Sequence, residues 1–334
     1  KDGLVMIEAP LRRDVAIAAP GMVLVSDRAF ELTPTERFLR VHRVALARAV
    51  ASARLRDGPV SREPVRRRAR VRDLLAIHLS EAWETAEALM IWGRLRCDKA
   101  MLDRAPNVRM IIRMGVGFDA LDIEEAGRRG IPACNVPDYG TTDVADHAIG
   151  LMLGLTRGIV QVHNKIVADP VGNWKSIDIP IMRRVRGTTF GIVGCGRIGT
   201  AAGLRAKAFG MNVVFYDPYV PDGKDQSVGF ERRESLEEML READVISVHT
   251  PLTAETNGMI NGQVISCMKE SAILITTSRG KVCDLDAVTD ALKNNRIAAA
   301  GLDVLPDEPP NPDHPLFTAL KAGEKWTEGR VIVT

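Results

Sequence analysis

Three glycines in the stretch 188–199 have the spacing Gly-x-Gly-x-x-Gly, which lets a backbone contact a pyrophosphate group. Gly194 permits a tight turn, Gly196 lets the backbone approach the phosphates, and Gly199 lets the following helix pack close to the strand. The pyrophosphate then meets free amides at the positive end of a helix dipole, where Ile198 lies. Such a triplet by itself also occurs in ordinary strand–turn–helix units, so its neighbours decide its meaning.

An acidic residue follows the glycine triplet at a suitable distance. Asp217 comes directly after the apolar segment 211–216, 18 residues beyond Gly199, and about 20 are expected before the acid that binds the adenosine ribose. Its carboxylate would accept hydrogen bonds from ribose hydroxyls and repel a 2′-phosphate, which favours NAD over NADP. Arg197, inside the turn, permits the opposite interpretation as a phosphate contact.

Two further charged residues lie after apolar segments, where an open parallel sheet binds its ligands. Arg279 follows the segment 273–276, and its planar guanidinium suits a carboxylate bound through two hydrogen bonds. The alternative for Arg279 is an ion pair at the strand end. Glu308 lies between Asp307 and two prolines, where a rigidly held carboxylate can orient an imidazole and raise its pKa. The alternative for Glu308 is a surface acid in a loop.

Apolar segments alternate with helical segments, which predicts an α/β fold with a doubly wound parallel sheet and right-handed crossovers. We expect a flavodoxin-like substrate domain over 1–137, in which 1–80 is hard to interpret. A Rossmann-type dinucleotide domain is expected over 138–334. The expected strands are 22–26, 86–92, 108–114, 131–136, 189–193, 211–216, 245–248, 273–276, 298–302 and 331–334, and the expected helices are 34–53, 98–104, 122–129, 142–167 and 284–294, with a further one opened by the capping box Ser235–Glu238.

Composition is typical of a globular protein, with 46% hydrophobic and 26% charged residues among 334. No run of 18 apolar residues exists, so no membrane-spanning helix is expected. The start of the chain has neither a signal-peptide layout nor an initiator Met, and we expect a fragment. Scattered cysteines predict a cytoplasmic protein without disulfides or a metal site; they are Cys97, Cys134, Cys195, Cys267 and Cys283.

Positive charge is concentrated near the start of the chain. The net charge is +2, but residues 1–80 hold 16 Lys or Arg and 9 Asp or Glu, a balance of +7. The excess peaks between Arg62 and Arg72, a pattern that also occurs in nucleic-acid or localisation patches. No aromatic residues lie between these arginines to stack on bases. We therefore interpret the segment as solvated surface and do not expect nucleic-acid binding.

From about residue 86 to residue 334, the sequence resembles the D-isomer-specific 2-hydroxyacid dehydrogenase family, most closely its C-terminal binding protein branch. The first eighty residues do not match. The matching stretches are 113–119 (RMGVGFD), 135–137 (NVP), the glycine turn, 204–210 (LRAKAFG), 215–219 (FYDPY), 249–253 (HTPLT), 278–280 (SRG) and 302–304 (LDV) with Glu308.

The resemblance implies a role for each matching residue. Arg279 would bind the α-carboxylate of the substrate and polarise its carbonyl, and Glu308 would orient a catalytic histidine. Substrate would also meet the amides of Val116 and Gly117, with Arg113 nearby. The residues implied to line the nicotinamide half of an NAD site are Thr250, Pro251, Thr256, Thr277 and Asp303. The family's two domains close over the cofactor.

The resemblance also implies a homodimer formed through the helix expected at 142–167. The helix carries a broad apolar face that could equally belong to the core, made of Val144, Ile149, Leu151, Met152 and Leu155.

The proton carrier is where the sequence departs from the family. In the family, the acid/base histidine lies in a Pro-His pair just after the last strand. The present sequence ends at Thr334, where that pair would begin. We expect a truncated chain that keeps NAD affinity but turns over 2-keto acids poorly. None of its own histidines is expected to replace the missing one: His249 belongs to a cofactor-side stretch, His147 has a packing role, His314 lies in a non-catalytic loop, and His42, His78 and His163 have no motif context.

The motifs and the resemblance lead to two alternative functions, one enzymatic and one not. The first is an NAD-dependent oxidoreductase that interconverts a D-2-hydroxy acid and its 2-keto acid. The second is a corepressor-like protein that senses NAD(H), which would permit a nuclear location. The stretch 204–219 favours the second function, and the unmatched start of the chain counts against it.

Overall fold

The computed structural model describes residues 22–26, 86–92, 95–174 and 181–334. The chain divides into two compact units, Lys1–Tyr139 and Gly140–Thr334. The division falls within two residues of the boundary expected at 137. The helix expected at 34–53 and the basic segment 62–72 lie outside the described residues.

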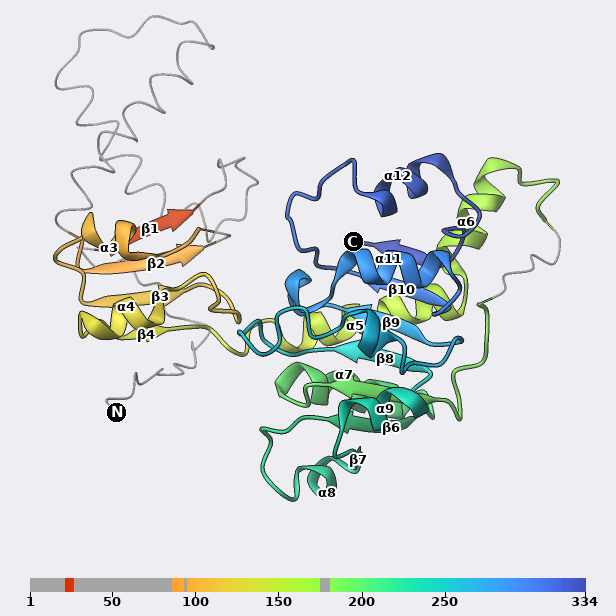
Figure 1. The fold of residues 1–334 in the computed structure, drawn as a ribbon, viewed down its shortest axis with the longest axis horizontal. Helices are drawn as coiled ribbons and strands as arrows, with labels where there is room; N and C mark the ends of the chain where they lie inside the picture. The colour runs from red at the N-terminus through yellow and green to blue at the C-terminus, as the bar shows by residue number, and fades with distance from the viewer. Residues whose placement is uncertain (1–21, 27–85, 93–94, 175–180) are drawn as a thin grey trace, which may run out of the picture. The chain divides into compact units, whose positions relative to one another are not determined.

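Unit 1 contains a parallel sheet whose described strands have the order β1-β2-β3-β4 (Figure 1). Two short helices begin where aspartates accept hydrogen bonds from backbone amides, Asp98 from Met101 at 3.0 Å and Asp122 from Glu125 at 2.9 Å. The flavodoxin-like arrangement stays a prediction. The elements are β1 (Met22–Ser26), β2 (Ala88–Trp92), α3 (Lys99–Asp103), β3 (Met110–Arg113), α4 (Ile123–Arg128) and β4 (Ala133–Cys134).

Unit 2 contains a seven-stranded parallel sheet in the order β11-β10-β9-β8-β5-β6-β7. The chain first extends the sheet from β5 toward β7, then returns to the other side of β5 with β8. This reversal is the point at which doubly wound sheets bind ligands. The expected fold class is therefore confirmed. The strands are β5 (Thr189–Val193), β6 (Asn212–Tyr216), β7 (Glu231–Arg232), β8 (Val245–Val248), β9 (Ile273–Thr276), β10 (Ala299–Leu302) and β11 (Val331–Val333).

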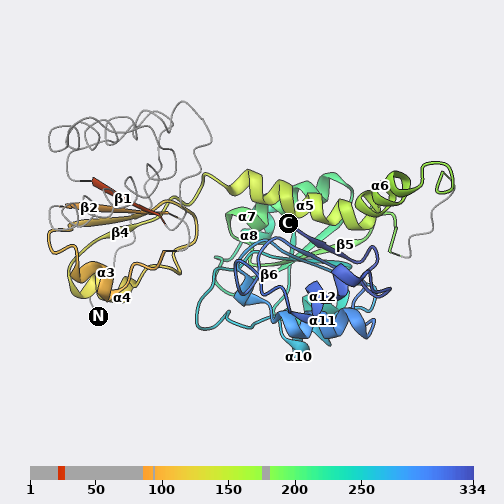
Figure 2. The same ribbon diagram turned by 90° about the horizontal axis from the view of Figure 1, so that it is seen from above.

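Helices cover both faces of this sheet (Figure 2). Successive strand residues point to opposite faces, so Ile273 and Ile275 pack in the core beneath α5 and α7, and Leu274 packs in the core beneath α9, α11 and α12. The helices are α5 (Thr141–Thr156), α6 (Ile159–Ala168), α7 (Arg197–Ala208), α8 (Lys224–Val228), α9 (Leu236–Glu242), α10 (Gly262–Ile265), α11 (Leu285–Lys293) and α12 (Pro315–Ala322).

The single helix expected at 142–167 is wrong. Gly158 has the left-handed backbone angle φ = 61°, and it separates α5 from α6. The apolar face expected to form a dimer contact belongs to the core, because Ile149, Leu151, Met152 and Leu155 are buried against the sheet. The alternative interpretation of that face was therefore the right one.

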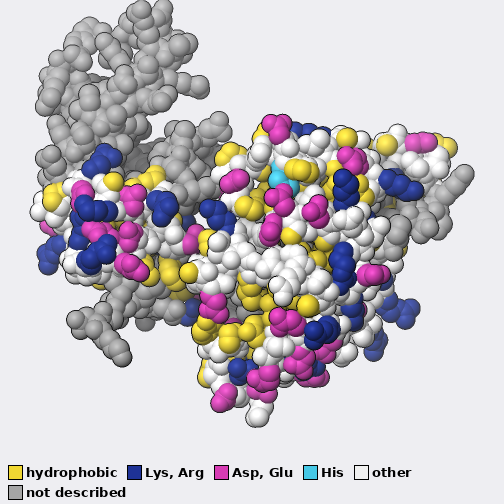
Figure 3. All heavy atoms as spheres, in the orientation of Figure 1, with side chains coloured by type: hydrophobic (Ala, Val, Ile, Leu, Met, Phe, Trp, Pro, Cys, Tyr) yellow, Lys and Arg dark blue, Asp and Glu magenta, His cyan; other side chains and the backbone are white. Residues whose placement is uncertain are grey.

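Helix ends inside the second unit follow the sequence signals closely. Ser235 accepts a hydrogen bond from the Glu238 amide at 3.2 Å, as the capping box predicts. Gly210, just after α7, has φ = 76°. Figure 3 shows acidic and basic side chains interspersed on the described part of the visible face. No helix within the described ranges is long and apolar enough to cross a membrane.

Candidate cofactor and substrate site

The turn after β5 is pressed against the segment after β8. Val193 and Val248 are register partners at the ends of these neighbouring strands. Gly194 has φ = 92°, and a Cβ atom there would lie 3.1 Å from the backbones of His249 and Thr250. Glycine is therefore required both for the backbone angle and for the close approach, at the point where the strand order reverses.

The other two glycines have opposite surroundings. A Cβ atom at Gly199 would overlap the Gly194 carbonyl oxygen, so this glycine brings α7 tightly against the end of β5. A Cβ atom at Gly196 would meet nothing within 4 Å. Gly196 is the N-cap of α7, and no side chain caps the helix. The amides of the first turn, including those of Arg197 and Ile198, thus form an anion-binding helix end beside open space.

Asp217 is held beside this turn by two backbone amides. The Cys195 amide donates to Oδ2 at 2.8 Å, and the Tyr219 amide donates to Oδ1 at 2.9 Å. The carboxylate is therefore fixed in orientation, and each oxygen keeps a lone pair for a ribose hydroxyl. The sequence located the acid but missed the Cys195 amide that fixes it, since a backbone donor carries no residue-type signal.

The ends of β8 and β9 carry hydroxyl groups that lack partners. Thr250 Oγ1, Thr277 Oγ1 and Ser278 Oγ are buried without a hydrogen bond to any described residue. A buried polar group without a partner costs about 1–3 kcal/mol. A polar ligand at this edge would relieve that cost. Together with the glycine turn and Asp217, these hydroxyls fit a dinucleotide laid across the strand ends.

Thr256 stabilises the loop that follows β8 through hydrogen bonds of its hydroxyl group. Its hydroxyl donates to the Pro251 carbonyl at 2.6 Å and accepts from the Thr253 amide at 2.8 Å. Thr256 therefore closes the loop after β8 and fixes the position of Pro251. Direct contact of either residue with a cofactor stays a prediction.

Arg279 and the loop that carries Glu308 are joined through the backbone. Arg279 follows β9 and donates from Nη1 to the Ser278 carbonyl at 2.7 Å. A Cβ atom at the next residue, Gly280, would overlap the backbone of Leu305. The Leu305 amide in turn donates to Glu308 Oε1 at 3.1 Å. The structure thus brings the two predicted charged residues into one assembly, which the sequence could not show.

Asp303 lies at the end of β10 and has two side-chain neighbours. The Thr334 hydroxyl donates to Asp303 Oδ1 at 3.1 Å, and His147 Nε2 lies 3.3 Å from the same oxygen. The packing role expected for His147 is therefore wrong, because its half-exposed ring makes polar contacts.

The other described histidines also have their own places. His249 Nε2 lies 2.9 Å from Ser247 Oγ, and burial lowers the pKa of His249 to about 4, so its ring is neutral at pH 7. His314 Nε2 lies 3.0 Å from Asp286 Oδ1. His163 is exposed on α6, and His42 and His78 lie outside the described residues.

Unit 1, taken by itself, presents two amides suited to an anion. The segment after β3 is shaped by buried Asn135, whose Nδ2 donates to the Val116 carbonyl at 2.7 Å. The amides of Val116 and Gly117 donate to no described acceptor. Arg113 Nη1 donates to the Ile91 carbonyl at 3.1 Å, at the base of the same segment. Asn135 was missed as a supporting residue, and its signal was an amide side chain within the apolar segment 131–136.

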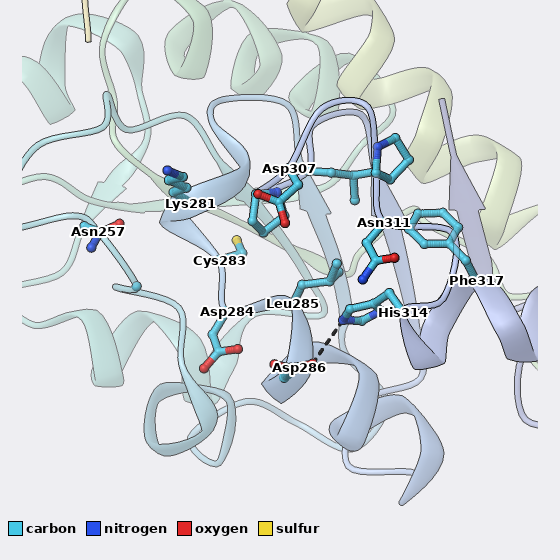
Figure 4. A pocket seen from close by; sticks show the side chains of 14 residues that line it. Asn257, Lys281, Cys283, Asp284, Leu285, Asp286, Asp307, Asn311, His314 and Phe317 are labelled. Atoms are coloured by element: carbon cyan, nitrogen blue, oxygen red, sulfur yellow. Dashed lines mark hydrogen bonds and ion pairs between the residues drawn. The ribbon is translucent and has the colours of Figure 1, made fainter. Parts of the chain in front are cut away.

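A pocket of about 340 Å³ is lined in part by the loop that carries Glu308 but contains none of the predicted site residues (Figure 4). Its wall carries the carboxylates of Asp284, Asp286 and Asp307 against the single cation Lys281. An excess of negative charge disfavours a pyrophosphate or a 2-keto acid. The strand ends, and not this pocket, are therefore the candidate site.

The comparison with known families agrees with this geometry. A family model described as "D-isomer specific 2-hydroxyacid dehydrogenase, NAD binding domain" matches residues 149–334. The chain belongs to this family. The match covers nearly all of unit 2, including every glycine of the turn and Asp217, so unit 2 contains the family's NAD binding domain.

Relatives in the family are reductases and dehydrogenases. The chain is 37% identical over 245 residues to a D-3-phosphoglycerate dehydrogenase of Methanocaldococcus jannaschii, covering 72% of this chain and 45% of the relative. It is 42% identical over 223 residues to a glyoxylate reductase of Korarchaeum cryptofilum, covering 66% of each. The chain thus spans about half to two thirds of the length of these relatives.

A solved structure shares the fold over most of the chain. A D-lactate dehydrogenase from Aquifex aeolicus, complexed with NAD and lactic acid, superimposes with a TM-score of 0.67 at 31% identity, covering 76% of this chain and 77% of that one. None of these relatives is described as a C-terminal binding protein, so that branch stays a prediction.

Proposed function

We propose that the protein is an NAD-dependent oxidoreductase that interconverts a 2-hydroxy acid of D configuration and its 2-keto acid. The observation that carries the proposal is the backbone contact between Gly280 and Leu305, which holds Arg279 and Glu308 together at the same edge as the glycine turn. Relatives named for glyoxylate reduction and a structural neighbour holding lactic acid support the substrate class.

Each residue of this chain has a distinct task in the proposed reaction. The bound cofactor supplies or accepts a hydride at the substrate's C2 atom. Arg279 anchors the carboxylate through its guanidinium and polarises the neighbouring carbonyl. Glu308 orients an imidazole that gives the substrate oxygen a proton during reduction and takes it back during oxidation. The amides of Val116 and Gly117 are the proposed contribution of unit 1 to carboxylate binding.

Asp217 supports NAD as the cofactor. Because two amides hold the carboxylate in place, it cannot turn away from a 2′-phosphate, and the repulsion would persist in the complex. The choice of NAD over NADP thus depends on a fixed negative charge.

The experiment is a spectrophotometric assay of NADH oxidation with glyoxylate and hydroxypyruvate, carried out on the full-length gene product. Arg279→Ala should lower kcat/KM on the order of a thousandfold, since one bidentate charge-assisted contact and the carbonyl polarisation are both lost. Arg241→Ala, on the exposed side of α9, is the matched control. Equal rates for the two variants, or no NADH binding by the unaltered protein, would refute the proposal.

We also propose a homodimer formed through α6 and the segment that follows it. α6 buries none of its residues, and Ile159, Val167 and Trp174 are 57%, 68% and 77% exposed. Exposed apolar side chains in this number indicate a protein contact. Sedimentation equilibrium should show a dimer for the unaltered protein and a monomer for Val167→Asp. A monomer in both cases would refute the proposal.

A further inference from the structure

We propose that His147 is a positioning residue that, together with Thr334, holds Asp303 in place to accept a hydrogen bond from the carboxamide of the nicotinamide ring. The inference rests on the proposed function, because it concerns the same cofactor site. It assigns a task to a histidine from α5 that the motifs of the site do not include.

Close packing of α5 on the sheet brings the three residues together. A Cβ atom at Gly301 of β10 would lie 3.1 Å from Leu151 of α5, and one at Gly154 of α5 would lie 2.9 Å from Ile332 of β11. Two glycines therefore let the helix approach these strands closely. β10 and β11 are neighbours, and the Thr334 amide donates to the Leu302 carbonyl at 3.0 Å. Asp303 and Thr334 consequently emerge side by side under His147.

The hydrogen atoms of this cluster can be assigned from its distances. The Thr334 hydroxyl has one hydrogen, and it donates this to Asp303 Oδ1 at 3.1 Å. Thr334 Oγ1 must then accept at the 2.9 Å contact with His147, so Nε2 carries a hydrogen. The same Nε2 lies 3.3 Å from Asp303 Oδ1. One ring nitrogen thus supports both Thr334 and Asp303.

Both contacts go to one oxygen of the carboxylate. Asp303 Oδ2 has no hydrogen-bond partner among the described residues. It lies at the carboxyl end of β10, on the same edge as Thr250 and Thr277. A carboxylate oxygen accepts hydrogen bonds and cannot donate them, so it selects a ligand group with an N–H or O–H donor. The carboxamide of nicotinamide has such an N–H donor, and ADP-ribose lacks this group.

The test compares the affinities of NADH and ADP-ribose by calorimetry, using the full chain. His147→Ala should weaken NADH binding about tenfold, because Asp303 loses an orienting hydrogen bond, and should change ADP-ribose binding less than twofold. His147→Gln places an amide nitrogen near the position of Nε2 and should restore most of the NADH affinity. Arg241→Ala, on the exposed side of α9, should leave both affinities unchanged.

Thr334→Val provides a second route if His147→Ala folds poorly. It keeps the shape of the side chain and removes the donor to Asp303, and it should also weaken NADH more than ADP-ribose. Equal losses for both ligands would mean a merely structural role, and no loss for either would mean no role, so each outcome overturns the inference. If the unaltered protein binds NADH and the variants bind it equally well, the positioning inference fails alone; if the unaltered protein does not bind NADH, the proposed function fails with it.

Discussion

The two ends of the cofactor site in unit 2 are built in opposite ways. At the ribose end, the protein satisfies its own polar groups: both oxygens of Asp217 receive backbone amides, and Gly199 fixes α7 against β5. At the nicotinamide end, the hydroxyls of Thr250, Thr277 and Ser278 are buried without partners. The first end is shaped without a ligand, and on the proposed function the second would be completed by the ligand.

This difference separates affinity from selectivity. A preorganised end loses little entropy on binding and supplies most of the binding energy. An end with unpaired polar groups rejects ligands that cannot pair with them. The ribose end should therefore tolerate few changes of shape, and the nicotinamide end should respond mainly to changes of hydrogen bonding.

The largest expected effect is at the preorganised end. Gly199→Ala forces a methyl group into the Gly194 carbonyl, so we expect a loss of about 3 kcal/mol in the free energy of unfolding and more than a hundredfold weaker NADH binding. Gly196→Ala is the matched control: its Cβ atom points into open space, so urea denaturation should show unchanged stability while NADH binding weakens. Unchanged stability in Gly199→Ala would show that α7 can move away from β5.

The next effect concerns His249 at the nicotinamide end. The pKa of its ring is lowered to about 4 by burial, against about 6.5 in the unfolded chain, so the native state favours the neutral ring. Its contribution is complete above pH 6.5 and is lost as the pH falls toward 4, by up to about 3 kcal/mol. Urea denaturation at several pH values should show a shallower acid loss for His249→Gln than for the unaltered protein. Parallel curves would contradict the prediction.

A substitution at the ribose end should change the preference between NADH and NADPH. The expected free-energy difference is smaller than in the two preceding predictions. Asp217→Ala removes the fixed charge, and the ratio of NADPH to NADH affinity should rise about 10- to 100-fold. Asp222→Ala removes a fully exposed carboxylate from the following loop and should leave the ratio unchanged. A ratio that moves equally in both variants would assign the effect to net charge alone.

The smallest effect is expected from a single hydroxyl at the nicotinamide end. Thr277→Val removes a buried hydroxyl that has no hydrogen-bond partner among the described residues, so the free protein should gain about 1 kcal/mol while stabilisation by NADH decreases. In Thr289→Val the lost hydroxyl is equally buried but donates to the Leu285 carbonyl at 2.7 Å, and this variant should lose stability. Thermal denaturation with and without NADH measures both; a destabilised Thr277→Val would remove the contrast between the two ends.

The sequence predicted the parts of the site whose contacts are local. The glycine turn, α7 and Asp217 lie within thirty residues of one another, and residue type with spacing was enough to identify them. The doubly wound parallel sheet also followed from the alternation of strands and helices. The proposed substrate residues Arg279 and Glu308 were identified from local sequence, Arg279 as a charged residue after an apolar segment and Glu308 as an acid between Asp307 and two prolines.

Contacts between distant parts of the chain could not be predicted. His147 and Thr334 are 187 residues apart, and no spacing rule relates a helix residue to the end of the last strand. Gly280 carries no sign that Leu305 will lie against it. The break at Gly158 was missed for a different reason, since an isolated glycine is tolerated within a helix and only its backbone angle shows that the helix ends.

The contact between Gly280 and Leu305 has a consequence for engineering new substrate ranges. The segments that carry Arg279 and Glu308 are in contact through Gly280 and Leu305, so we expect the effects of the two residues on rate to be non-additive. Libraries that randomise or lengthen the loop from Leu305 to Asn311 would disturb carboxylate anchoring before they altered the reactive end. Selection for activity on a larger 2-keto acid should therefore change residues outside this loop. Gly280 and Leu305 should be left unaltered.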